Sequence, residues 1–177
     1  MDDMGEFGEA IVAASGLLMS AERVIVATGS GMGVDSGLPT FRGASGLWTG
    51  PAGLAHGLNP GAFEKDPAAA WAFVLNFVAA CRGAEPHDGY RILSRWRSAR
   101  WSAEGCSAFA ATSNVDEHLQ RSGWPAGDLW EVHGSMSLGQ CLRFCHFGVF
   151  PIDAAIFEQD ITGERRDIPR CPRCGGG

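Results

Sequence analysis

A glycine-rich turn at residues 29–33, GSGMG, follows a short apolar run and precedes the motif Phe41-Arg42-Gly43. Backbone N–H groups in such a turn can approach a pyrophosphate, and the start of the helix that follows favours an anion. The dinucleotide fingerprint G-x-G-x-x-G fails because Val34 stands where its third glycine belongs. A P-loop fails too, because no Gly-Lys-Ser/Thr follows. On the glycines alone, a turn without a ligand is an equal alternative.

The residues after the turn favour a ligand. Arg42 can close on a phosphate through a bidentate contact, and Phe41 can cover a sugar or base and exclude water. Asn114 and Asp116 lie two apart on an extended stretch, so their side chains point to one face, where a carboxylate can accept from a carboxamide N–H₂. His133 is a candidate general base. The structural alternatives are an Asx turn for SNVD and a core position for the histidine.

Four of the six cysteines form two close pairs, Cys141 with Cys145 and Cys171 with Cys174. Four thiolates match a structural tetrahedral zinc site with no open position. The connection between the pairs is longer than the usual span of about 15–20 residues, and coincidence is the alternative. The two other cysteines, at positions 81 and 106, fall in predicted helix and strand contexts, where we expect inert packing residues.

The elements that position these residues alternate between helices and strands. We expect an amphipathic first helix, a buried strand over 23–28, a mobile loop over about 44–67 and two helices over 66–83 and 85–98. Asp66 is the predicted N-cap of the helix that starts at Pro67 and stops at Gly83. The next helix has Tyr90, Leu93 and Trp96 on its apolar side.

Two more strands, AFAATSNVD and LWEVHGSMSLGQC, the latter broken by Gly134, complete the pattern of an α/β domain with a parallel sheet. Ligands in such sheets bind at the carboxyl ends of strands. The glycine turn at 29–31, the segment 113–116 and His133 all fall at predicted strand ends. We therefore expect them to share one rim.

Composition limits the classes of function. The chain has 177 residues, 45% hydrophobic and 19% charged, with a net charge of −6, which is typical of a folded domain without a nucleic-acid footprint. No apolar run reaches the roughly 18 residues that span a bilayer, and the first residues are acidic where a signal peptide is basic. We expect a cytoplasmic protein without membrane or nucleic-acid partners, in which cysteines serve metal or catalysis.

The stretch TGSGMGVDSGLPTFRGASGLW resembles the signature of the sirtuins, the NAD-dependent protein deacylases. Four further motifs follow in the order of that family: EPHDGYRIL, TSNVDEHLQRSG, EVHGS and CPRCGG. The resemblance covers nearly the whole chain. It implies a Rossmann-like NAD-binding domain with a small zinc-binding module, which we expect at residues 1–140 and 141–177, with a mobile cofactor loop and helical segment at about 44–100.

The resemblance also implies roles for individual residues. His133 and Asn114 would be catalytic, with His133 taking a proton from a ribose hydroxyl as an acyl group passes from lysine to ADP-ribose and nicotinamide leaves. The cofactors would be NAD and zinc, and the partner an acylated-lysine protein or peptide. The implied NAD-binding residues are Gly29, Ser30, Gly31, Met32, Thr40, Phe41, Arg42, Ser113, Asn114, Val115 and Asp116. The implied zinc ligands are Cys141, Cys145, Cys171 and Cys174.

Two other interpretations stay open. The same scaffold could serve an NAD glycohydrolase or an ADP-ribosyltransferase, or the chain could be a catalytically incomplete NAD- or partner-binding module. Sirtuins continue past the second cysteine pair, so we expect this chain to lack part of the family's sheet, to bind NAD weakly on its own, and to self-associate through an unpaired sheet edge.

Several positions depart from the family pattern. Ser30 and Gly33 replace an alanine and a serine of the turn, and Ser113 and Glu117 flank the Asn-Val-Asp core in place of Gln and Gly. Sirtuins that remove acidic acyl groups carry a Tyr-x-x-Arg pair on the helix after the loop. Val74 and Phe77 stand there instead. We therefore expect an apolar pocket suited to acetyl or fatty acyl groups.

Overall fold

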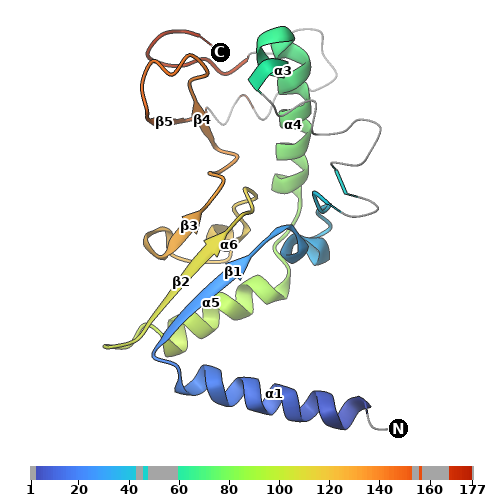
Figure 1. The fold of residues 1–177 in the computed structure, drawn as a ribbon, viewed down its shortest axis with the longest axis vertical. Coiled ribbons are helices and arrows are strands. Elements are labelled where there is room, and N and C mark those ends of the chain that lie inside the picture. Colours follow the sequence, from blue (N-terminus) through green and yellow to red (C-terminus); the bar gives the residue numbers. More distant parts are fainter. Residues whose placement is uncertain (1–2, 43–45, 48–59, 153–155, 157–167, 177) are drawn as a thin grey trace.

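The computed structural model describes residues 3–42, 46–47, 60–152, 156 and 168–176. Three parallel strands form the main sheet in the order β1 (Arg23–Thr28), β2 (Ser107–Thr112) and β3 (Leu129–Glu131). Ile25 lies opposite Phe109, and Ala111 lies opposite Trp130. The expected α/β architecture with a parallel sheet is confirmed (Figure 1).

The described helices cover one face of the sheet and leave the other open (Figure 1). The chain begins with α1 (Asp3–Ser20), which extends away from the rest of the fold. The 3-10 helix η1 (Ser30–Ser36) follows β1, and α5 (Asp88–Arg100) lies across one face of the sheet. Short segments α6 (His118–Arg121) and η2 (Ala126–Asp128) connect β2 to β3.

The helix α4 (Pro67–Gly83) forms as its sequence predicts. Asp66 is the N-cap, and its Oδ1 accepts a hydrogen bond of 3.0 Å from the backbone N–H of Ala69. Proline at the first position has no N–H to leave unsatisfied and has the φ of a helix. The helix stands upright beside η1 and carries one wall of the cavity described below (Figure 1).

Most of the predicted loop over about 44–67 lies outside the described residues. Its last part is helical instead: Pro60–Lys65 form α3, so the loop prediction was wrong there. Proline again starts the helix, and tertiary packing supplies the rest, because the Phe63 ring meets Trp71 of α4 edge-on with 5.7 Å between ring centroids. An isolated helix of this length would not be stable.

The larger of the two hydrophobic clusters in the described residues lies on one face of the sheet. Tyr90 and Trp101 from α5 and its end pack with Ala108 and Ala110 of β2, and Trp124 completes the cluster. The opposite face carries Ile25, Phe109 and Trp130, which are 76%, 40% and 58% exposed. The expectation of a buried first strand was therefore wrong, because the described elements pack against only one of its faces.

Two helix predictions need similar correction. The first helix is present, but Ile11, Val12 and Leu17 are exposed, and only Leu18 packs against the core. On α5, Trp96 is 46% exposed because it lies over the groove toward α1 and not over the sheet.

Within the described residues no single helix is both long and apolar enough to cross a bilayer. The bent pair α4 and α5 passes such a test together, by length and composition only.

The third predicted strand is indeed broken near Gly134, which has a φ of +80°, a left-handed conformation that suits glycine. Its second half is β4 (Leu138–Gln140), which leaves the main sheet and pairs antiparallel with β5 (Val149–Pro151). We call residues 138–152 and 168–176 the cysteine module. It lies beside α3 and the upper part of α4, beyond the carboxyl end of the sheet (Figure 1).

Candidate functional site

The carboxyl ends of β1 and β2 are tied together by polar side chains. Thr28 Oγ1 donates to Thr112 Oγ1 over 2.7 Å, and Asn114 Nδ2 donates to the carbonyl oxygen of Gly29 over 2.9 Å. The N–H of Ser113 donates to the Thr28 carbonyl at 3.1 Å. The glycine turn and the SNVD segment therefore lie side by side, as expected from the position of both at strand ends.

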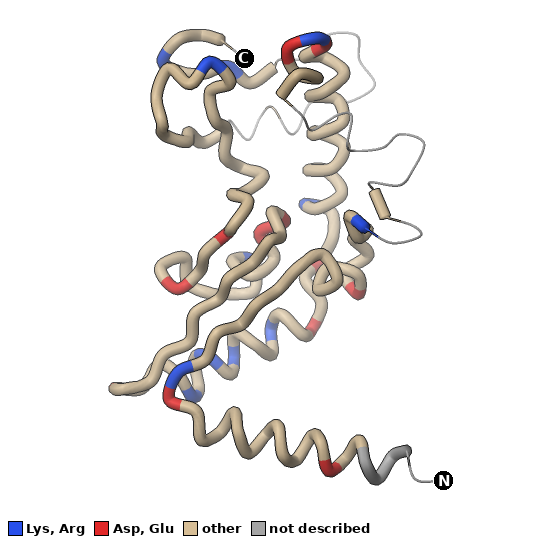
Figure 2. The backbone as a smooth tube through the Cα atoms, in the orientation of Figure 1, with Lys and Arg blue, Asp and Glu red and all other residues tan. Residues whose placement is uncertain are grey.

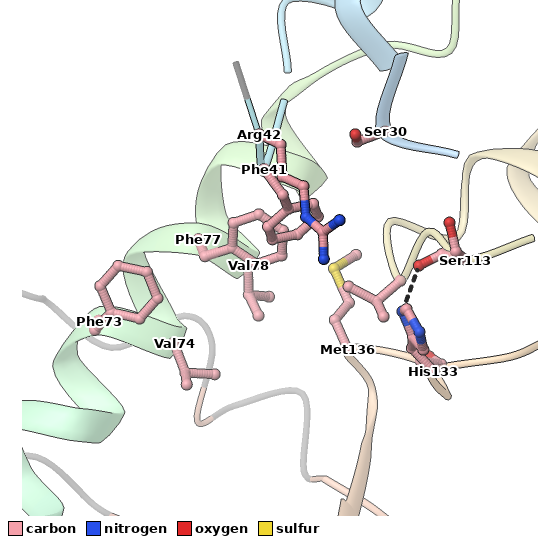
Figure 3. A pocket seen from close by; sticks show the side chains of 12 residues that line it. Ser30, Phe41, Arg42, Phe73, Val74, Phe77, Val78, Ser113, His133 and Met136 are labelled. Atoms are coloured by element: carbon pink, nitrogen blue, oxygen red, sulfur yellow. Dashed lines mark hydrogen bonds between the residues drawn. The ribbon is translucent and has the colours of Figure 1, made fainter. Parts of the chain in front are cut away.

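A cavity of about 520 Å³ opens at this rim, between the sheet and α4 (Figure 3). Six of the predicted site residues line it: Ser30, Phe41, Arg42, Ser113, Val115 and His133. Arg42 extends into it from the segment after the glycine turn (Figure 3). Residues that are far apart in the sequence thus converge on one space. That convergence is what a shared ligand site requires.

His133 follows β3 and turns toward the β2 end of the rim. Its Nδ1 lies 3.0 Å from the carbonyl oxygen of Ser113 (Figure 3). Because a carbonyl only accepts, Nδ1 must carry the proton, and Nε2 of the neutral ring is left with the lone pair. The imidazole is exposed and faces the cavity, so it is not the core histidine of the structural alternative. This arrangement is suited to a general base.

Asn114 and Asp116 are both buried, and they line a small recess of about 20 Å³ next to the cavity. Asp116 Oδ1 accepts from the His118 N–H at 3.0 Å, so the Asx turn foreseen as an alternative is present. Its Oδ2 faces Gly33, 3.7 Å from where a Cβ would lie. The recess has room for about one water. An aromatic ring is too large for it.

Four predicted cofactor-binding residues, Gly29, Gly31, Met32 and Thr40, line neither the cavity nor the recess. Met32 packs against the core instead, and its carbonyl oxygen lies 2.8 Å from His87 Nε2. Thr40 Oγ1 donates to the carbonyl oxygen of Arg42 at 2.9 Å, which shapes the backbone of that segment.

Gly33, where the family pattern has a serine, lies close to Leu38. A Cβ at this position would lie 3.3 Å from the Leu38 side chain, and the residue is buried. The serine that the family places here would therefore press on its neighbour. Gly31 differs, because no atom lies within 4 Å of a Cβ built there. The backbone of the turn is thus open on the side of Gly31.

The α4 wall of the cavity is apolar. Val74 and Phe77, the two positions singled out in the sequence, both line it. The centroid of the Phe77 ring lies 5.9 Å from the centroid of the Phe41 ring. Phe73 and Val78 line the same wall and were missed. The spacing i, i+1, i+4, i+5 places all four on one helix face, which is the signal that could have found them.

Two residues after His133 were also missed, although both line the cavity. Ser135 donates a short hydrogen bond to Glu117 Oε1, and the Met136 N–H donates to the Val115 carbonyl at 3.2 Å. Glu117 has a φ of +60°, a left-handed conformation that costs a non-glycine residue about 1 kcal/mol or more. This strained residue ties the loop after β2 to the loop that carries His133.

The four predicted zinc ligands come together in the cysteine module. Their sulfur atoms all lie within 4.8 Å of one another, with 3.7 Å between Cys141 and Cys174 and 3.5 Å between Cys145 and Cys171. Four sulfurs bound to zinc at ~2.3 Å would be about 3.8 Å apart, so the set fits a tetrahedral metal site. Hydrogen bonds, first that from the Cys145 backbone N–H, lower the pKa of the Cys141 thiol to about 6, whereas burial and the neighbouring thiols raise the pKa of Cys145 to about 12.

The other two cysteines lie away from this cluster. Cys81 is fully buried in α4, and burial raises the pKa of its thiol to about 12. Cys106 is half-buried before β2, with Arg100 Nη1 3.0 Å from its sulfur. A buried, protonated thiol is unreactive. This agrees with the prediction that Cys81 is an inert packing residue.

The sequence of this chain matches a known protein family. A family profile described as the Sir2 family matches residues 29–177. The chain therefore belongs to the Sir2 family, as its motifs indicated. It is similar to NAD-dependent protein deacylase 1 of Pseudomonas aeruginosa, at 32% identity over 90% of this chain and 60% of that protein. It is 34% identical to an NAD-dependent protein deacetylase of Chromobacterium violaceum over 90% of this chain and 59% of that protein.

Solved structures show the same fold. A mutant Sir2 homologue in complex with ADP-ribose matches with a TM-score of 0.70 and 26% identity over 90% of this chain and 57% of that one. A Sir2 homologue bound to NAD matches with a TM-score of 0.68 and 26% identity over 90% and 56% of the two chains. The chain thus spans about 60% of the length of the curated relatives named above.

Proposed function

We propose that this chain carries the reaction site of an NAD-dependent protein-lysine deacylase. The observation that carries the proposal is the convergence of the glycine-turn residue Ser30, Arg42 and His133 on one cavity with an apolar wall. An anion site, a base and an apolar surface at one place are the parts that acyl transfer to a dinucleotide requires. The names of the relatives support the same activity.

The residues present fit the pyrophosphate of NAD, whereas the recess of about 20 Å³ at Asn114 and Asp116 would have to widen for its nicotinamide ring. The N-terminus of η1 has no side-chain cap, and the backbone at Gly31 is open, so N–H groups are available to a pyrophosphate. Arg42 would add a charged contact to the same phosphates. In a widened recess, Asn114 and Asp116 would meet a carboxamide and ribose. When bound, NAD supplies the ADP-ribosyl group that accepts the acyl group as nicotinamide leaves.

His133 would act at Nε2. Its Nδ1–H is held by the Ser113 carbonyl, so the imidazole can take up a proton at Nε2 and share the resulting charge with that carbonyl. Phe41 and Phe77 would cover the reacting end and keep water out. Zinc would have a structural role, because four cysteines leave no coordination position open.

Product analysis tests the proposal. The protein is incubated with NAD and a panel of acyl-lysine peptides, and mass spectrometry follows the peptide, nicotinamide and the ribose product. We expect deacylated peptide and an acylated ADP-ribose in equal amounts. His133→Ala should lower the rate about 10²- to 10⁴-fold while the affinity for NAD, measured by calorimetry, stays the same. Nicotinamide release without any acyl-lysine peptide would instead identify an NAD glycohydrolase.

A further inference from the structure

The residue after the second cysteine of the module, His146, lies against the sulfur cluster. Its Nδ1 is 3.1 Å from the sulfur of Cys145 and 4.0 Å from the sulfur of Cys171. The residue is half-buried, and the spacing of the cysteines gave no reason to include it in the site. The metal cluster therefore has a nitrogen atom at its side as well as four sulfurs.

The packing around His146 fixes the direction of its ring. A Cβ at Gly148 would lie 3.3 Å from Cδ2 and 3.9 Å from Nε2 of the imidazole, so this edge of the ring lies over the glycine. The Phe150 ring is inclined to the imidazole by 31°, with 6.4 Å between the two centroids. Because these neighbours hold the Nε2 edge, the Nδ1 edge faces the sulfurs.

Distances separate two roles for this nitrogen. Zinc bonds of about 2.1 Å to nitrogen and 2.3 Å to sulfur would hold a histidine ligand about 3.6 Å from each sulfur of a tetrahedral site. Nδ1 is instead closer to Cys145 and farther from Cys171, the unequal spacing of a hydrogen bond to Cys145. When zinc is bound, each cysteine is a thiolate and can only accept. Nδ1 must then carry the proton and donate it.

Two of the other sulfurs receive hydrogen bonds from the backbone. Cys141 and Cys171 each accept from N–H groups of the residues that follow them. At Cys145 the donor is a side chain, His146, in place of a backbone group. Donors of this kind around a metal orient its ligands and tune their basicity. The imidazole thus does for Cys145 what the backbone does for its neighbours.

The charges of the module favour such a donor. Four thiolates around one Zn²⁺ leave two negative charges uncompensated. Residues 138–152 and 168–176 contain three arginines and no aspartate or glutamate. Figure 2 shows this described part of the module with positive positions and no negative ones. An N–H group beside a thiolate adds positive charge density where the excess negative charge lies.

We propose that His146 is a positioning residue of the zinc centre: its Nδ1–H donates to the Cys145 thiolate, fixes that ligand and lowers its reactivity toward electrophiles. The ring is not a zinc ligand. Without it, Cys145 is the ligand that leaves zinc first. The inference concerns the cysteine module and does not depend on acyl transfer at the rim.

Variants of the whole chain test this through zinc affinity, measured by competition with a chelator. His146→Phe keeps an aromatic ring near Phe150 but has no donor, and it should weaken zinc binding about 10- to 100-fold. His146→Asn keeps an N–H₂ group near the position of Nδ1 and should restore most of the affinity. Phe147→Ala, at a neighbouring residue that is 94% exposed, is the control and should bind zinc as the wild type does.

Alkylation of the zinc-loaded proteins locates the effect. Mass spectrometry of the modified peptides follows each cysteine separately. In His146→Phe, Cys145 should react up to about tenfold faster relative to Cys141 than in the wild type, because a hydrogen bond to a charged acceptor is lost. In His146→Asn and Phe147→Ala, the ratio of the two rates should stay close to that of the wild type.

Equal zinc affinity in His146→Phe and the wild type would overturn the proposal, as would an equal loss in Phe147→Ala. Cadmium NMR of the cadmium-loaded proteins tests the other role. A large change of the cadmium shift between the wild type and His146→Phe would show that the nitrogen is a ligand and would overturn the hydrogen-bond assignment. If His146→Phe does not fold, the comparison of His146→Asn with His146→Ala gives the same test.

Discussion

The rim of the sheet and the cysteine module are held in place by different forces. At the rim, each functional segment follows a strand of the parallel sheet, and hydrogen bonds such as Asn114 to Gly29 and His133 to Ser113 fix the loops to one another. In the described residues, the module has the two short strands β4 and β5 and a cluster of four cysteines placed to hold a metal ion. Backbone topology builds the first region, and we expect a bound metal to hold the second together.

This difference matters because the residues that line the cavity at the rim come from the rim and α4, and none belongs to the cysteine module. Loss of the module should therefore leave the core around Tyr90 and Trp101 folded. The predictions below separate the two regions, starting with the largest effect.

Removal of one zinc ligand should unfold the module. We expect about one zinc per chain in the metal-replete protein and almost none in Cys171→Ala, because structural zinc contributes on the order of 10 kcal/mol to folding. Hydrogen exchange should become fast in β4 and β5 and stay slow in β2 and α5. Cys106→Ala, which removes a cysteine outside the cluster, is the control and should keep its zinc. Loss of protection in β2 as well would show that the two regions fold as one unit.

At the rim, Arg42→Ala should weaken NAD binding about tenfold, because a hydrogen bond between charged groups is removed. The weakening should shrink at high salt, since the side chain is exposed and its charge is screened. Calorimetry at two salt concentrations measures both effects. Arg95→Ala, on the exposed side of α5, should bind NAD as the wild type does. Binding that is insensitive to Arg42 would remove this residue from the phosphate site.

The tie between the two rim loops should be measurable as a coupling energy. In a double-mutant cycle, Glu117→Gln and Ser135→Ala together should cost less than the sum of the single changes by about 1 kcal/mol, measured by urea unfolding. Additive effects would mean that the hydrogen bond between these side chains contributes nothing. Glu117→Gly is informative as well, because it removes the tie but relieves the left-handed backbone, so its net effect on stability should be small.

The two regions are predicted from different signals in the sequence: residue spacing indicates the module, and strand topology indicates the rim. Helix α4 was placed from Asp66 and Pro67, since capping and proline act locally. The cysteine cluster was visible from spacing alone. The strand ends carrying Asn114 and His133 were expected to meet because parallel topology brings them together. Local rules and topology both leave a trace in the sequence.

Other features leave no such trace. Glu117 and Ser135 are 18 positions apart, and nothing in either segment signals that they meet. His118 is fully buried, and its ring centroid lies 5.4 Å from that of Tyr90. From the sequence, a polar side chain of this kind would be expected at the surface. The exposed Ile25 on β1 was missed because an apolar strand indicates burial without showing which of its faces is covered. Contacts between distant segments decide these cases.

The smallest predicted effect concerns Glu131, two positions before His133. Burial raises the pKa of its carboxyl group above the ordinary 4.5, with Glu117 and Asp116 adding to the rise and a hydrogen bond with Gln120 opposing it. Among the described residues, Oε1 is buried without a hydrogen-bond partner. The folded protein therefore holds the proton more tightly than the unfolded chain, and its stability falls as the pH rises from the unfolded pKa through the folded one.

Glu131→Gln keeps the shape and stays neutral, so it should raise the free energy of unfolding at pH 7 on the order of 1 kcal/mol. Near pH 4 both proteins carry a mostly neutral group, and the difference should shrink. Urea unfolding at the two pH values measures this, with Glu104→Gln, an exposed glutamate, as the control. A Glu131→Gln protein that is less stable than the wild type at pH 7 would show that the carboxylate forms a favourable contact and that burial does not dominate its energetics.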